Sequence, residues 1–275
     1  MFFTRLLSSI VLVLVALVTL LRGGYLLAAV LLLISLVAYR ELCKACNLNM
    51  DAEEKSVNAL EAAGYAGIVV YYGIVVFSSS QAAQMLSILF VMIGMMFVYV
   101  FTFPKYQASQ VMAAFFGFAY APVMFSFIYQ TRQLQYGIYL VWMIFISSWV
   151  CDTFAYLTGM MIGKHKMTPK LSPKKSIEGA IGGVVGSALA GVLFGYFIVE
   201  RVVPDQQITW VFAVIGGIGA MISQIGDLAA SAIKRNHNIK DYGHLIPGHG
   251  GIMDRFDSVI FTAPMIYGLA LLFIR

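Results

Sequence analysis

Long apolar runs alternate with short polar connections along most of this 275-residue chain. Several of the runs exceed the ~18 apolar residues that are typical of a transmembrane helix. The pattern predicts an all-α, polytopic integral membrane protein with about nine transmembrane helices. We expect the helices at residues 6–21, 25–42, 63–78, 82–101, 108–128, 137–162, 178–200, 209–234 and 258–274.

The composition agrees with this pattern and excludes a soluble core of the same size. Hydrophobic residues make up 60% of the chain and charged residues only 11%, whereas soluble domains are roughly 45–50% apolar. No low-complexity tract or linker interrupts the sequence. We therefore expect residues 1–275 to form a single membrane domain.

The basic residues predict the orientation of the helices. Of the 18 lysines and arginines, 14 fall at the N-terminus or in every second connection. By the positive-inside rule, this asymmetry places the N-terminus in the cytoplasm. It also places the two richest polar loops, residues 163–177 and 235–257, on the cytoplasmic side, and we expect them to form one site there. The opposite side has Arg22, Arg132, Arg201 and Arg275.

The sequence favours neither nucleic-acid binding by the basic residues nor disulfide bonds or a zinc site formed by the cysteines. The chain has no basic and aromatic module typical of nucleic-acid binding, so the net charge of +5 reflects topology. Its three cysteines are an odd number without framework spacing, which argues against structural disulfides. Cys43 and Cys46 have C-x-x-C spacing, but no second pair completes a zinc site, and we interpret the pair as incidental.

The eighth predicted helix has a polar stripe. Gln224, Asp227, Ser231 and Lys234 are spaced at i, i+3, i+7 and i+10, so they share one face, with Arg235 beside it. Asp227 and Lys234 are two turns apart, about 10.5 Å along the axis. That is too far for a direct pair, so Asp227 needs another partner. Because intramembrane charges are costly, a metal or substrate role is favoured over a pair without function.

Two features follow this helix. The turn around His249 includes Gly250 and Gly251, and its bare backbone suits either an anion-binding concavity or a plain re-entrant turn. Just before the last predicted helix stand Asp254, Arg255 and Asp257. Helix capping requires only one Asp there, so it does not explain the second Asp and the Arg. A carboxylate here and Asp227 could reach one hard cation, because Mg²⁺ takes one or two carboxylates together with water and phosphate oxygens.

The lysine-rich loop at residues 163–177 ends in Lys174, Lys175 and Ser176. Its five lysines suit a topogenic or headgroup role and equally a polyphosphate site. Asp152 precedes this loop by two to three turns, on a face with Tyr156, and is interpreted either as a buried hydrogen-bonded Asp or as a residue near the site. Together these residues predict a site for a phosphate-bearing substrate at a lipid boundary, where chemistry is mainly positioning and charge neutralisation.

The segment from Ser231 to Asp257, which includes Lys234, Arg235, Lys240, Asp241, Gly243, Pro247, His249, Gly250, Gly251, Asp254 and Arg255, resembles the signature of the phosphatidate cytidylyltransferases, or CDP-diacylglycerol synthases. The stretches beginning at Asp152 and at Ser172 are similar to the middle region of that family. The family commonly has Trp before Glu178, where this chain has Ile177. The resemblance is sharp over about residues 150–260, and before that it is a likeness of hydropathy.

The resemblance implies transfer of the cytidylyl group of CTP to phosphatidate, a membrane lipid, with release of pyrophosphate. It implies Mg²⁺, alone or with a second cation, and a homodimer in the cell membrane. Residues 1–136 would then serve as a scaffold and a candidate dimerisation surface, and residues 137–275 would contain the catalytic helices and loops.

The resemblance, by matching positions, makes Asp227 and Asp254 the metal ligands. We expect Asp227, Asp254 and Lys234 to be the catalytic residues. The expected substrate-binding residues are Lys174, Lys175, Ser176, Arg235, Lys240, His249, Gly250, Gly251 and Arg255. Asp152, Asp257, Ser231 and Asp241 are expected nearby in supporting roles.

Two other functions compete with this one. A CTP-dependent polyprenol kinase shares part of the chemistry. An ion-coupled transporter would use Asp152 and Asp227 as intramembrane ion sites, but the inverted repeats typical of such transporters are not detectable in this sequence.

Overall fold

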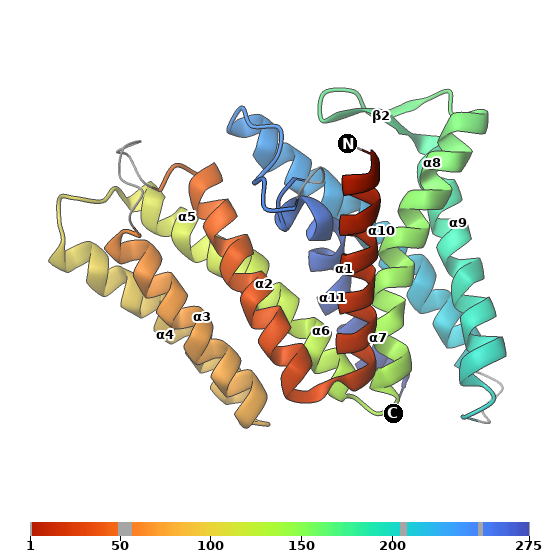
Figure 1. Ribbon diagram of the computed structural model, residues 1–275, viewed down its shortest axis with the longest axis horizontal. Helices are drawn as coiled ribbons and strands as arrows, with labels where there is room; N and C mark the ends of the chain where they lie inside the picture. Colours follow the sequence, from red (N-terminus) through yellow and green to blue (C-terminus); the bar gives the residue numbers. More distant parts are fainter. Residues whose placement is uncertain (1, 49–56, 204–207, 247–249, 275) are drawn as a thin grey trace. The chain divides into compact units, whose positions relative to one another are not determined.

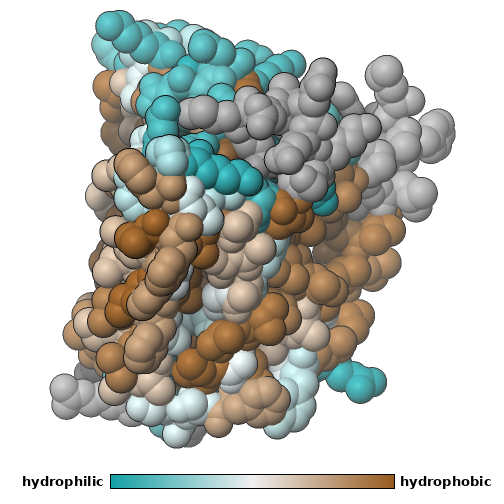
Figure 2. Space-filling model, turned by 90° about the vertical axis from the view of Figure 1, so that its left-hand side faces the viewer, coloured by the Kyte–Doolittle hydropathy of each residue, from teal (hydrophilic) through white to brown (hydrophobic). Residues whose placement is uncertain are grey.

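The computed structural model describes residues 2–48, 57–203, 208–246 and 250–274, and almost all of its regular structure is helical (Figure 1). The all-α membrane architecture is confirmed. Among the described residues, eight helices are long and apolar enough to cross a membrane, and the described part of the first helix adds a shorter apolar stretch at Ile10–Arg22. Figure 2 shows one face, on which hydrophobic residues cover a large area.

The chain divides into two compact units, residues 1–129 with 237–255 and residues 130–236 with 256–275. The first unit consists mainly of α1 to α5 and a helical turn of π type, η1. The bounds of these elements are α1 Phe2–Arg22, α2 Gly24–Ala45, α3 Ala59–Phe77, α4 Gln81–Phe101, α5 Ala108–Phe118 and η1 Ala119–Val123. The next helix, α6 at Met124–Gln133, runs across the boundary between the units.

The second unit contains the remaining helices and a short hairpin that the sequence pattern did not indicate. The bounds are α7 Gly137–Phe145, η2 Ile146–Val150, α8 Cys151–Ile162, β1 Lys166–Thr168, β2 Ser172–Ser176, α9 Ile177–Phe194, η3 Gly195–Val199, α10 Ile208–Asn236 and α11 Met253–Phe273. Helix α11 also runs across the boundary, since its residues 253–255 belong to the first unit. The lysine-rich loop is thus an antiparallel hairpin, in which Lys166 pairs with Ser176 and Thr168 with Ser172.

Two helices begin earlier than their hydropathy predicts. Helix α3 begins at Ala59 because Asn58 and Glu61 form a capping box, in which the Glu61 N–H donates to Asn58 Oδ1 at 2.8 Å. Helix α11 begins at Met253 rather than near residue 258. Asp254 and Asp257 therefore lie in its first turns, not ahead of it.

Polar pairs tie the helices together inside each unit. In the first unit, the hydroxyls of Ser35 and Tyr72 are 2.8 Å apart in a buried contact between α2 and α3. In the second, the buried hydroxyls of Ser148 and Thr262 are 3.0 Å apart and link η2 to α11. Ser148 thus faces the core, whereas Asp152, one turn further on, is exposed. The π turn between them changes the helical register.

Glycines let the helices of the second unit approach closely, and several of those on α9, such as Gly179 and Gly183, are four residues apart and share a face. A Cβ atom on Gly183 would lie 2.9 Å from the backbone oxygen and 2.9 Å from the sulfur of Cys151 on α8. On α10, a Cβ atom on Gly226 would lie 2.8 Å from the backbone oxygen of Asp257. The backbones of α8 and α11 thus occupy the space that larger side chains would need.

We expect Gly183→Ala to destabilise the packing of α8 on α9. The added methyl group meets backbone as well as side chain, and overpacking of this kind costs about 1–3 kcal/mol. The detergent-solubilised protein should unfold at a lower temperature, as measured by thermal melting. Gly268→Ala on α11 is the matched control, because nothing lies within 4 Å of its Cβ position. Equal melting temperatures for the two variants would contradict this account.

Candidate functional site

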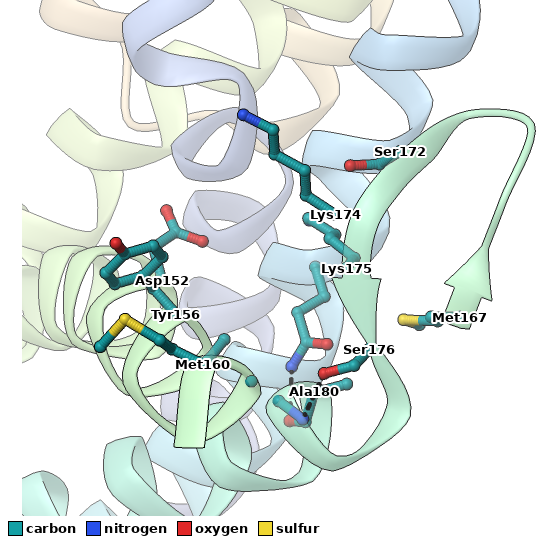
Figure 3. Close-up of a pocket in the computed structure, with 13 residues that line it drawn as sticks. Asp152, Tyr156, Met160, Met167, Ser172, Lys174, Lys175, Ser176 and Ala180 are labelled. Carbon is teal, nitrogen blue, oxygen red and sulfur yellow. Dashed lines mark hydrogen bonds between the residues drawn. The ribbon is translucent and has the colours of Figure 1, made fainter. Parts of the chain in front are cut away.

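A cavity of about 360 Å³ opens between α8, the hairpin and α9 in the second unit. Asp152, Tyr156 and Met160 line it from α8, and Lys174 and Lys175 line it from β2 (Figure 3). The walls therefore combine an acidic and aromatic side with a basic one. Such a cavity suits a ligand with both phosphate and apolar parts.

The partner that Asp227 needs is Lys175. The Lys175 ammonium forms an ion pair with Asp227 Oδ2, which joins β2 to α10. Both side chains are 27% exposed, so the pair lies at a surface that solvent still reaches. The hairpin supplies this lysine from a segment about 50 residues away, a pairing that helical spacing cannot reveal.

Two further carboxylates stand close to this pair. Asp152 on α8 interacts electrostatically with Asp227 and Lys175. Asp257, in the first turns of α11, interacts with Asp227, Lys234 and Asp152. Like charges gathered in this way repel one another, so the group needs the lysines or another cation for balance. The structure thus brings together five residues that the sequence assigned to one site: Asp152, Lys175, Asp227, Lys234 and Asp257.

Polar residues at the inner end of the cavity fix its walls. Gln224 on α10 is buried and donates from Nε2 to the backbone oxygen of Ala180 at 3.0 Å. Ser176 was expected to bind substrate, and its hydroxyl lines the cavity while it caps α9 by accepting the Gly179 N–H at 3.2 Å. The polar stripe of α10 is thus used in part to hold α9 and the hairpin in place.

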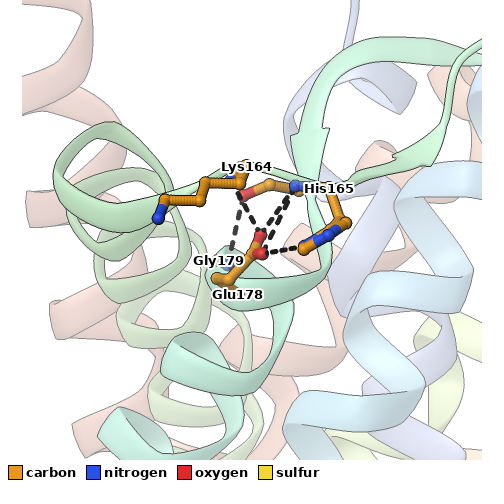
Figure 4. A network of polar contacts seen from close by, with 5 residues as sticks. Lys164, His165, Glu178 and Gly179 are labelled. Carbon is orange, nitrogen blue, oxygen red and sulfur yellow. Dashed lines mark hydrogen bonds and ion pairs between the residues drawn. The ribbon is translucent and has the colours of Figure 1, made fainter.

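Glu178 fastens the base of the hairpin (Figure 4). Its carboxylate accepts the backbone N–H of Lys164 at 3.1 Å and that of His165 at 3.2 Å. The His165 ring adds a contact of 2.6 Å through Nδ1. These contacts tie the start of α9 to the end of α8, and so they set the position from which β2 extends Lys174 and Lys175.

The first unit has its own polar cluster around Asp254. Asp254 Oδ2 accepts the N–H of Tyr242 at 2.8 Å and that of Gly251 at 3.0 Å. The Ile246 N–H donates to the Gly250 oxygen at 2.9 Å, and Gly250 has a φ of 85°, which favours glycine. The turn was expected to be either an anion-binding concavity or a plain re-entrant turn, and the positive φ of Gly250 is a feature that a turn of either kind can use.

The other predicted residues are placed as follows. Ser231, Lys234 and Arg235 lie on α10, with Arg235 exposed. Lys240, Asp241 and Arg255 are exposed in the first unit, and His249 lies outside the described residues. Asp227 and Asp254 belong to different units, so their sharing of one cation stays a prediction.

Two buried glutamates, Glu41 and Glu61, lie in neither predicted loop. Glu41 on α2 is 6% exposed and accepts the N–H groups of Ile252 and Met253. The signal that could have indicated its importance was its position, because Glu41 and the adjacent Arg40 are the charged residues of the predicted helix at 25–42. The nearby Cys43 and Cys46 are both free thiols in the structure.

The donor chemistry near Asp227 fits a hard cation such as Mg²⁺. Carboxylate oxygens are its usual protein ligands, and it needs only one or two of them because water and phosphate complete its shell. The described residues contain no cluster of three or more His, Cys, Asp or Glu residues arranged to hold a metal ion. Water and substrate phosphate oxygens would complete the shell of a cation held by Asp227, because Mg²⁺ takes only one or two carboxylates.

The fold and cavity together define a multi-pass membrane protein with a pocket lined by Asp152, Lys174 and Lys175, a combination suited to phosphate-bearing ligands. The chain belongs to the cytidylyltransferase family, which matches residues 3–273, and it is a nucleotidyltransferase. The chain is similar to a protein of Staphylococcus aureus named phosphatidate cytidylyltransferase, with 34% identity over 95% of this chain and 96% of the relative. A Staphylococcus saprophyticus protein of the same name is 30% identical over the same shares.

We expect Glu178→Gln to loosen the hairpin. An amide keeps one acceptor oxygen where the carboxylate uses two, so at least one contact to Lys164 or His165 is lost. Trypsin should then cut at the hairpin lysines faster than in the wild-type protein, as followed by mass spectrometry. Glu200→Gln is the control, because Glu200 accepts from Thr209 rather than from the hairpin. Unchanged cleavage in Glu178→Gln would remove Glu178 from this role.

Proposed function

We propose that this chain transfers the cytidylyl group of CTP to phosphatidate and so makes CDP-diacylglycerol for phospholipid synthesis. The observation that carries the proposal is the pairing of Lys175 with Asp227 at a cavity with apolar and polar walls. It is supported by family membership along nearly the whole chain and by the names of the staphylococcal relatives.

The reaction exchanges one phosphorus–oxygen bond for another. A phosphate oxygen of phosphatidate attacks the α-phosphorus of CTP, the new P–O bond forms, and the bond from the α-phosphorus to the bridging oxygen of the β-phosphate breaks. Pyrophosphate leaves with that pair of electrons. Phosphatidate is already anionic, so no side chain has to act as a general base. Catalysis then depends on positioning and on neutralising phosphate charge.

Side chains of the second unit divide this work. Lys174 and Lys175 extend from β2 into the cavity and neutralise phosphate oxygens, and Lys175 is already oriented by Asp227. Lys234 interacts electrostatically with Asp257 and adds a further positive charge near the carboxylates. Tyr156 and Met160 offer an apolar wall for the lipid.

Mg²⁺ completes the proposal. Asp227 is the ligand offered by the second unit, with Asp152 and Asp257 as neighbouring carboxylates, and Asp254 is the ligand offered by the first. When bound, the ion supplies positive charge to the phosphate oxygens. The proposal also includes a homodimer in the cell membrane and a site that faces the cytoplasm, an orientation supported by the excess of Lys and Arg in alternate connections.

The direct test uses purified wild-type protein, CTP labelled in the cytosine ring and Mg²⁺, with either phosphatidate or a polyprenol as acceptor. We expect labelled cytidine in a lipid product with phosphatidate and none with the polyprenol. CTP labelled at the γ-phosphate separates the alternatives further, because a polyprenol kinase would move that label into the lipid. Transfer of the γ-label to polyprenol, without cytidine transfer to phosphatidate, would overturn the proposal.

Replacing Asp227 tests the carboxylate side of the site. We expect Asp227→Asn to lower kcat by about 100-fold or more, the scale seen when one electrostatic group of an active site is removed. The amide keeps the shape of the side chain but loses its charge, so the protein should still insert and purify. Glu200→Gln, which removes a carboxylate bonded to Thr209, serves as the control. Near-wild-type turnover by Asp227→Asn would refute the assignment.

A further inference from the structure

Glu41 on α2 places a carboxylate at the start of α11, more than 200 residues away in the sequence. Its Oε1 accepts the N–H of Ile252 at 3.0 Å and its Oε2 accepts that of Met253 at 2.8 Å. Met253 is the first residue of α11. The first N–H groups of a helix have no partner within the helix, and here a side chain from another helix provides one.

Glu41 and Asp254 act on the same short stretch of backbone. Asp254 Oδ2 accepts the N–H groups of Tyr242 and Gly251, and Glu41 accepts those of Ile252 and Met253. Two carboxylates thus bind three consecutive backbone N–H groups and a fourth from Tyr242. Both of Glu41's oxygens are used, so its function depends on the carboxylate and not on size or polarity alone.

The space around the Glu41 carboxylate is closed by glycines. A Cβ atom on Gly251 would lie 2.6 Å from Glu41 Cδ, and one on Gly243 would lie 2.9 Å from it. The side chain itself is only 6% exposed. Burying a charged group is costly unless hydrogen bonds compensate it, and a negative charge is stabilised at a helix N-terminus. This arrangement holds the carboxylate against one segment of backbone.

We infer that Glu41 is a positioning residue, which sets the start of α11 and thereby the place of the Asp254 carboxylate. The inference rests on the proposed function, in which Asp254 is a cation ligand. Glu41 touches backbone rather than substrate, so its effect passes through Tyr242, Gly251 and Asp254. Residues that orient a ligand in this way typically matter 10–100-fold for metal affinity or activity.

The test compares Glu41→Gln and Glu41→Asp with the wild-type enzyme in detergent or nanodiscs. The amide of Gln has one acceptor oxygen and turns a donor toward a second N–H, so one backbone contact is lost. We expect Glu41→Gln to lower kcat about 10–100-fold at saturating CTP and phosphatidate and to raise the Mg²⁺ concentration needed for half-maximal activity. Glu41→Asp keeps two acceptor oxygens, and we expect it to recover part of this loss.

A second measurement reads the backbone directly. Hydrogen–deuterium exchange in peptides that cover residues 250–256 should be faster in Glu41→Gln, because the Ile252 and Met253 amides lose a partner. The matched control is Glu61→Gln. Glu61 is also a buried glutamate of the first unit that accepts a backbone N–H, but it caps α3 through Asn58. We expect Glu61→Gln to leave kcat, the Mg²⁺ requirement and the exchange at residues 250–256 unchanged.

The outcomes separate the two proposals. Unchanged exchange at residues 250–256, or an unchanged kcat and Mg²⁺ requirement per folded molecule, in Glu41→Gln would overturn the role of Glu41. Loss of folded protein alone, with normal kcat in the remainder, would also overturn it, because that is a purely structural effect. Absence of cytidylyl transfer by the wild-type enzyme would overturn the proposed function, whatever the exchange shows.

Discussion

A carboxylate within or beside apolar helices is stable only when donors or cations surround it, and this requirement governs the polar chemistry of both units. Asp227 in the second unit has Lys175, which the hairpin delivers. Glu41 and Asp254 in the first unit have backbone N–H groups instead. The two solutions differ in consequence: an ion pair leaves a lysine positioned for phosphate, whereas backbone donors fix the course of the chain.

The Lys175–Asp227 ion pair depends on the close packing of helices in the second unit. Gly179 and Gly183 let α9 pack against the backbone of α8. Gln224 joins α10 to α9 by its hydrogen bond to the backbone oxygen of Ala180. Ser176 and Glu178 then hold the hairpin at the end of this packed group. Lys174 and Lys175 thus reach the cavity from a hairpin that is held at both ends, at Lys164 and His165 by Glu178 and at Ser176 by the start of α9.

Membership in the cytidylyltransferase family relates the lysines and the apolar wall of the cavity to one reaction. Transfer of a nucleotide to a lipid requires one place where a charged and an apolar substrate meet. A cavity with lysines on one wall and Tyr156 and Met160 on another provides that combination within the second unit. The role proposed for Glu41 extends this logic to the N-terminal helices, since it links α2 to the stretch of the first unit that carries Asp254.

The sequence by itself determined the membrane-spanning helices, the family and the residues that gather near Asp227, because hydropathy and motif spacing are local properties of the chain. It also indicated that Asp227 lacks a helical partner, since Lys234 is two turns away. Only the tertiary structure decided that Lys175 is this partner, that the lysine-rich loop is a hairpin, and that Glu41 caps α11. These are contacts between segments far apart in the chain, and their geometry depends on how the helices pack.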